Sequence, residues 1–181
     1  MNDKEIKVEL ITWLKTFVER PNSLLGDWAP CPYARQARVN NKIQIEISET
    51  PLLEAAVKDN LFLLDEDPID GTEPEKDVLV ICFDHKDITP DELREFVEKL
   101  NQDLMPKDYV ILEDHPEEAD DQINSVDMHF NKCGLLLVQR LSKLNDASET
   151  LKQKGYYDNW SDHELEYVVN WRLLNSSDGK V

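Results

Sequence analysis

A short, continuous apolar run limits the architecture of this chain more than any other feature of its sequence. The run DVLVICF, residues 77–83, shows no alternation of apolar and polar side chains and is shorter than an average helix. It therefore predicts a β-strand that is covered on both faces. Two other segments have strand character. KIQIEIS (42–48) places isoleucine at every second position, which is typical of a strand with one buried face, and DYVILE (108–113) predicts a third strand.

Helix signals lie between these predicted strands. Thr50 and Pro51 fit the N-cap and the first position of a helix. Thr89, Pro90 and Glu92 form a complete capping box ahead of apolar residues at helical spacing. Strands alternating with helices over such short connections are typical of crossover units on a layered sheet. We therefore expect an α/β fold with a small three- or four-stranded sheet packed with helices, and a ferredoxin-like topology is the closest alternative.

Further helices are expected outside this alternating region. Near the N-terminus, apolar side chains recur at helical spacing over residues 6–17. Beyond Glu113 the pattern loosens, and a helix is then predicted over CGLLLVQRLSKL (133–144). Another is predicted over 146–154, and a last one begins at the capping box of residues 161–164.

The length of the chain indicates one main core. A chain of 181 residues, 40% of them hydrophobic, can bury one good core but hardly two. We therefore expect an α/β domain over residues 1–144 and a C-terminal helical extension over residues 145–181 packed on it.

The charge of the chain limits its partners. Its 38 acidic and 20 basic side chains give a formal net charge of -18, which repels phosphate backbones and anionic lipid alike. We therefore expect no nucleic-acid partner and no membrane partner. No apolar run approaches the roughly 20 residues that span a bilayer, and MNDKEIKVEL lacks the features of a signal peptide. A cytoplasmic location is expected.

The cysteines point to one candidate site. Three widely spaced cysteines with no C-x-x-C pair indicate reduced thiols rather than a disulfide framework or a zinc site. In DWAPCPYARQARV, Pro32 is typical of the first position of a helix, so Cys31 would be the N-cap, where backbone N–H groups lower a thiol pKa. Arg35 and Arg38 follow at helical spacing on the same face. The alternative is that Cys31 is an ordinary buried residue and that both arginines pair with surplus carboxylates.

His115 is the second candidate. It follows the third predicted strand, where open α/β sheets tend to place ligands. If it meets Cys31, the catalytic pair Cys31 and His115 could direct a thiolate toward a small anionic electrophile. The ligand-binding residues would then be Tyr33, Arg35, Arg38 and Arg140. The alternative is that DHPEE is an exposed turn.

Histidines near strand ends raise the question of a metal site. His85, His115 and His129 have no H-x-H or H-x-x-x-H spacing, so the sequence assigns neither a metal nor a cofactor.

Several short motifs resemble those of a bacterial family of unknown function. That family has an N-terminal W-L helix, an L-C-P-F-A motif, an apolar strand ending near a histidine, a strand that runs into F-H-P, and a late L-L-x-R-like helix. The matching residues here are 13–14, 31–34, 78–85, 114–116 and 136–140. Tyr33 and Asp114 stand where the family has phenylalanine. The resemblance covers residues 6–144 and implies a fold and a site location, without a reaction.

We consider three functions. The first is a small-molecule enzyme or binder that takes an anionic ligand at the Cys31 and His115 site, and the residue pattern fits an enzyme and a binder equally well. The second is a protein–protein interaction module that uses the aromatic C-terminal extension, with GYYDNW, Tyr167 and Trp171. The third is an acidic nucleic-acid mimic, which would need its carboxylates in a patterned surface ribbon.

Overall fold

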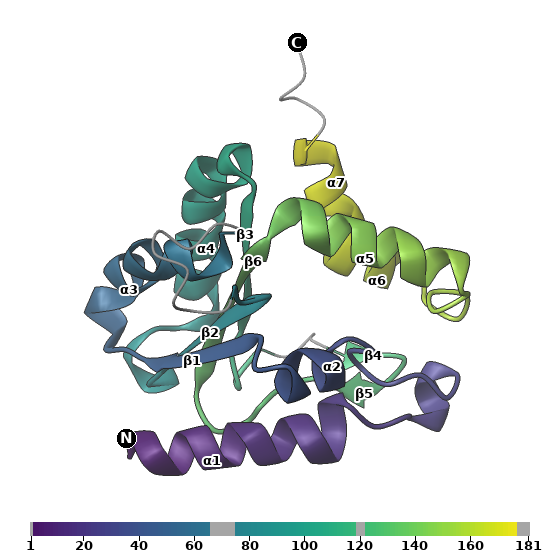
Figure 1. The fold of residues 1–181 in the computed structure, drawn as a ribbon, viewed down its shortest axis with the longest axis horizontal. Coiled ribbons are helices and arrows are strands. Elements are labelled where there is room, and N and C mark those ends of the chain that lie inside the picture. The colour runs from purple at the N-terminus through teal and green to yellow at the C-terminus, as the bar shows by residue number, and fades with distance from the viewer. Residues whose placement is uncertain (1, 66–74, 119–121, 177–181) are drawn as a thin grey trace.

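A mixed β-sheet organises the computed structural model, which describes residues 2–65, 75–118 and 122–176 (Figure 1). Its four strands have the order β1-β2-β6-β3. β1 is parallel to β2, and β6 is antiparallel to both β2 and β3. A small hairpin, β4–β5, lies apart from this sheet. The strands are β1 (Ile43–Ile47), β2 (Val78–Phe83), β3 (Tyr109–Asp114), β4 (Gln122–Ile123), β5 (Val126–Asp127) and β6 (Gly134–Arg140).

Helices precede, connect and follow the strands. The α-helices are α1 (Asp3–Trp13), α2 (Ala34–Val39), α3 (Leu53–Asn60), α4 (Pro90–Leu104), α5 (Leu141–Gln153), α6 (Asp162–Leu165) and α7 (Trp171–Ser176). The π-helical segment η1 (Leu14–Val18) continues α1, and the π-helical segment η7 (Glu166–Asn170) joins α6 to α7. Shorter 3-10 turns are η2 (Ser23–Leu25), η3 (Thr50–Leu52), η4 (Leu61–Leu64), η5 (His85–Asp87) and η6 (Met105–Lys107).

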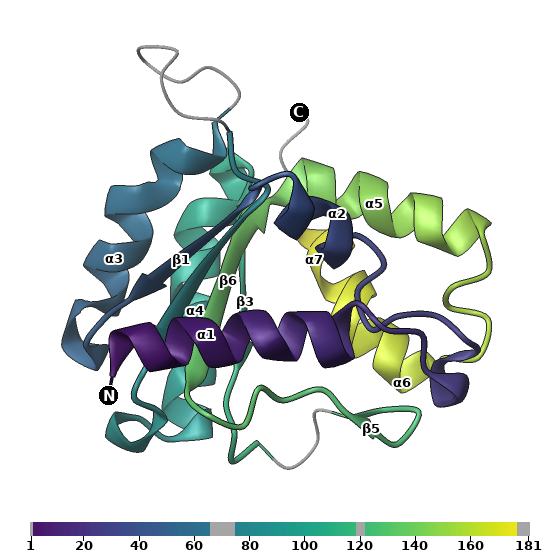
Figure 2. The same ribbon diagram turned by 60° about the horizontal axis from the view of Figure 1, so that its bottom comes forward.

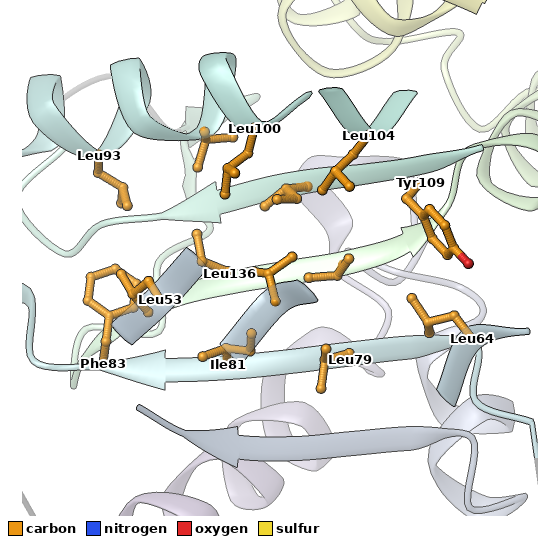
Figure 3. Packing of buried hydrophobic residues seen from close by; sticks show 14 residues of the cluster. Leu53, Leu64, Leu79, Ile81, Phe83, Leu93, Leu100, Leu104, Tyr109 and Leu136 are labelled. Atoms are coloured by element: carbon orange, nitrogen blue, oxygen red, sulfur yellow. The ribbon is translucent and has the colours of Figure 1, made fainter. Parts of the chain in front are cut away.

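α3 and α4 cover one face of the sheet. Leu79, Ile81 and Phe83 alternate along β2 and are buried against these helices together with Leu136 and Val138 of β6. Figure 3 shows these side chains gathered between the strands and the helices. Burying each such side chain contributes about 1.5–3 kcal/mol, so this layer supplies much of the driving force for folding.

α1 covers the opposite face, and Figure 2 shows it crossing in front of the strands. Ile6 and Leu10 pack there against Val80, Cys82 and Leu135. Because successive side chains on a strand point to opposite faces, β2 and β6 supply apolar residues to both layers. This double burial explains the continuous apolar run of β2.

The α/β class expected from the sequence is confirmed, with four strands in the sheet. The β2–α4–β3 unit is a split crossover, since β6 lies between its two strands, as in ferredoxin-like folds. The parallel strands β1 and β2 lie side by side, however, which distinguishes this sheet from the ferredoxin-like alternative.

The helix predicted over residues 133–144 is wrong. Gly134–Arg140 forms the strand β6, and α5 begins directly after it at Leu141. β6 is buried on both faces between β2 and β3, so it has no alternation, and such a run does not distinguish a strand from a buried helix. Gly134 lets β6 begin beside the end of β2, because a Cβ there would overlap the ring of Phe83.

The C-terminal helices are attached to the α/β domain at several points. The residue boundary expected at 144 falls inside α5, which is continuous with β6. Tyr156 donates a hydrogen bond to the carbonyl of Pro30 at 2.7 Å. Arg172, only 2% exposed, donates to the side chains of Asn145 and Ser148 on α5. In the part of the chain that the structure describes, no helix is long and apolar enough to cross a membrane.

Candidate functional site

A cavity of about 530 Å³ lies between the sheet and the helices α1 and α2. We call it the α1–α2 cavity. Its apolar lining comes from α1 (Leu10, Trp13), β2 (Val78, Val80) and β6 (Leu135, Leu137). The sheet face that α1 leaves partly uncovered thus forms its floor.

The α2 side of the cavity is built from small and polar side chains. Ala34 and Ala37 line it from α2, and their short side chains leave space that larger residues would fill. Gln36, Asn40 and Asp77 also line it and are exposed, so the polar part of the cavity is its solvent side. The remaining polar lining residues are Cys31, Lys42 and Gln139.

Cys31 and Tyr33 are the predicted site residues that the cavity contains. Cys31 is not the N-cap of a helix, because α2 begins at Ala34 and Tyr33 is its N-cap residue. Although Cys31 as a residue is exposed, burial of its thiol raises its pKa above the ordinary value. The backbone N–H groups of Tyr33 and Ala34 lower the pKa, but by less. These surroundings favour a neutral thiol, in contrast to the thiolate expected from the sequence.

The arginines predicted beside Cys31 are directed elsewhere. Arg38 donates two hydrogen bonds to the carboxylate of Glu19, at 2.5 and 2.9 Å. This contact holds the pKa of Glu19 below its ordinary value, with a smaller contribution from the charge of Arg35, which is exposed. The alternative considered for the sequence was that both arginines pair with surplus carboxylates. Arg38 does so.

His115 lies at the other end of the sheet and is 3% exposed. Its Nδ1 accepts the backbone N–H of Glu117 at 3.1 Å, and its Nε2 faces the carbonyls of Ile88 at 2.9 Å and His85 at 3.2 Å. This pattern fits the tautomer protonated at Nε2, so both ring nitrogens are used by the backbone. The turn considered as the alternative is present, since the N–H of Glu118 donates to the carbonyl of His115, but the exposure expected for His115 is wrong.

Arg140 lies on the face of the sheet opposite the α1–α2 cavity. It alternates with the cavity residue Gln139 and packs over the ring of Tyr109, with 4.9 Å from the guanidinium carbon to the ring centroid. It also forms ion pairs with Asp65 and Asp108, each at 3.0 Å. The expected ligand-binding and catalytic residues therefore occupy three separate places: one near α2, one beyond the end of β3 and one on the far face.

A buried contact between a histidine and a carboxylate, which the sequence did not indicate, lies near His115. Nδ1 of His129 is 2.6 Å from a carboxylate oxygen of Asp114, and Nε2 is 2.9 Å from the carbonyl of Glu118. The other oxygen of Asp114 accepts the backbone N–H of Phe130 at 3.0 Å. Through these contacts of both ring nitrogens, His129 fastens the segment after β3 to the strand. The only signal in the sequence was an acid and a histidine in a segment without periodicity.

Metal-ligating side chains do not converge in the described ranges. Among these residues, no group of three or more histidine, cysteine, aspartate or glutamate side chains is placed to hold a metal ion.

Comparisons with known proteins find no relative of this chain. No family model matches the chain, and neither the curated proteins nor the solved structures contain a match.

Proposed function

We propose that this protein binds a small, mainly apolar molecule with one polar end in the α1–α2 cavity. The observation that carries the proposal is the cavity itself. Its volume of about 530 Å³ lies within the range of about 300–1,000 Å³ found for small-molecule sites.

The lining of the cavity supports this ligand chemistry. Trp13, Val80 and Leu137 belong to its apolar lining, which would take up the apolar body of the ligand. Gln36 and Asn40 on the solvent side offer both hydrogen-bond donors and acceptors to a polar end. The proposal keeps the small ligand expected from the sequence but does not require an anion, because Arg38 and Arg140 are bound to carboxylates.

The π-helical segment η1 contributes to the shape of the cavity. Leu14 and Val18 of η1 both line it, and π-helical turns occur often at functional sites. The wider turn belongs to the same helix that supplies Leu10 and Trp13, so α1 and η1 form one wall together.

Filling the cavity tests the proposal. Ala37→Phe would place a ring in the space that the ligand requires, and we expect it to weaken binding of the fluorescent probe anilinonaphthalene sulfonate by at least about tenfold. Ala55→Leu, at an exposed position of α3, is the matched control and should leave the dissociation constant unchanged. Equal probe binding by the parent chain and by Ala37→Phe, with both folded by circular dichroism, would overturn the proposal.

A further inference from the structure

A second and larger hollow, of about 1,000 Å³, lies between α4, the end of β3 and the C-terminal helices. We call it the α4–α7 groove. It is lined by side chains from α4 (Val97, Glu98), β3 (Leu112), η7 (Glu166, Val168) and α7 (Trp171). Its volume is at the upper end of the range for small-molecule sites, which favours a larger occupant such as a segment of another protein.

The apolar part of the groove is rich in adaptable side chains. Met105 and Met128, the two methionines that follow Met1 in the sequence, both line it, as do Trp13 and Trp171. Methionine is unbranched and polarisable, and it is common at surfaces that accept apolar faces of varied shape. Aromatic side chains supply large contact areas at binding interfaces.

The charged part of the groove is acidic. Glu98 of α4 and Glu166 of η7 line it and are exposed. Arg94 also lines it, but its guanidinium is bound to Asp91 at 2.9 Å and to Glu118 at 2.5 Å, so its charge is matched. In a molecule with a formal net charge of -18, this rim complements a cationic partner.

The sheet edge beside the groove is closed to an added strand. The side chain of Asn101 donates to the carbonyl of Ile111 at 2.9 Å and accepts the N–H of Ile111 at 2.8 Å. A buried amide therefore occupies the N–H and C=O of Ile111, in the middle of β3, which a further strand would need on this edge. An occupant with its own internal hydrogen bonds, a helix, is favoured over an extended peptide.

We propose that the α4–α7 groove binds a basic amphipathic helix of a partner protein. The apolar face of that helix packs against Met128 and Trp171, and its lysine or arginine side chains meet Glu98 and Glu166. A second copy of this chain is disfavoured as the occupant, because two acidic molecules repel each other.

Charge reversal at matched positions tests this proposal. The probe is a fluorescein-labelled model peptide of leucine and lysine with helical amphipathic spacing, titrated against the full chain by fluorescence anisotropy. We expect saturable binding, a gain of peptide helicity by circular dichroism, and a loss of affinity of at least about tenfold in the double variant Glu98→Lys and Glu166→Lys. The control is the double variant Glu49→Lys and Asp59→Lys, which changes the net charge equally at exposed positions outside the groove and should bind as the parent does.

Three kinds of outcome would overturn the proposal. The first is equal weakening by both double variants, which would mean attraction to the overall charge alone. The second is absence of saturable binding, or equal binding of a peptide in which glutamate replaces lysine. The third is a parent chain that sediments as a dimer and that Glu98→Lys with Glu166→Lys dissociates, since the groove would then hold a second copy. Ala37→Phe should still bind the peptide saturably, so failure of this proposal is separable from failure at the α1–α2 cavity.

Discussion

Cys31 illustrates how a residue's chemistry depends on where a helix begins. The Cys-Pro pair suggested a thiol at a helix N-terminus, but Pro32 fits a turn as well as a first helical position. The backbone N–H of Cys31 donates to the carbonyl of Val18 at 3.1 Å, and that of Ala34 donates to the carbonyl of Cys31. These contacts place a turn at residues 31–33, with α2 beginning after it.

The raised pKa of Cys31 has a measurable consequence for its reactivity. Only the thiolate is alkylated, so a raised pKa moves the midpoint of the rate-against-pH curve upward, and we expect it above the ordinary thiol value of about 8.5. Iodoacetamide labelling followed by peptide mass spectrometry measures this, and Cys31→Ser controls for the assignment. Cys82 and Cys133 are fully buried and should label only on unfolding. A midpoint clearly below about 8 would instead support the activated thiolate inferred from the sequence.

His115 and Arg140 show why the rest of the candidate site was not predictable. The partners of the His115 ring include carbonyls of residues 85 and 88, which are remote in sequence. Arg140 points away from the α1–α2 cavity because it is one position from Gln139 on a strand that had been expected to be a helix. The residue types identified side chains that can bind ligands or transfer protons. Which of them lie close together depends on the face and the end of the sheet that each one occupies. The resemblance to the bacterial family stays a prediction.

At the scale of elements, local sequence patterns predicted the helix caps and three of the four strands of the main sheet. The capping boxes at Thr89 and Ser161 form as expected, and β1, β2 and β3 lie where their runs indicated. β6 was missed because double burial removes the alternation that distinguishes a strand from a helix. The hairpin β4–β5 was also missed, since its strands have two residues each and turn through Asn124 and Ser125 with positive φ.

Asn101 connects two elements, α4 and the edge of β3, and its replacement should lower the free energy of unfolding. In Asn101→Leu the N–H and C=O of Ile111 would lose their partners in a buried place, and we expect a loss of about 2 kcal/mol or more in the free energy of unfolding. Urea denaturation followed by circular dichroism measures this. Asp103→Ala, at an exposed position on the same helix, should change the stability by no more than about 0.5 kcal/mol. Equal midpoints for the two variants would contradict the bridging role of Asn101.

At the scale of the whole molecule, the C-terminal segment is joined to the α/β domain through shared apolar clusters. Trp160 and Val168 pack against Leu25, Ile123 and Val126, which lie near the N-terminal loop and the β4–β5 hairpin. Trp171 packs with Met105, Val110 and Leu141. Packing of the extension on the domain was expected, but its particular contacts were not, because they join residues distant in the sequence, such as Leu25 and Trp160.

Truncation before Tyr156 tests how far the α/β domain depends on this segment. Removing residues 156–181 would uncover the clusters around Leu25 and Val110, so we expect the free energy of unfolding to fall by at least about 3 kcal/mol. The midpoint of urea denaturation measures the loss. The truncated chain should also lose affinity for the leucine–lysine peptide, since Glu166 and Trp171 would be absent. An unchanged midpoint would indicate that the segment contributes nothing to the stability of the domain.

Trp13, Leu135 and Leu137 line both the α1–α2 cavity and the α4–α7 groove. A guest that shifts the indole ring on one side therefore reshapes the space on the other. If each site binds its ligand, the two affinities are thermodynamically linked. Each ligand then changes the affinity of the other by the same factor. Trp13 would then couple binding in the α1–α2 cavity to binding in the α4–α7 groove.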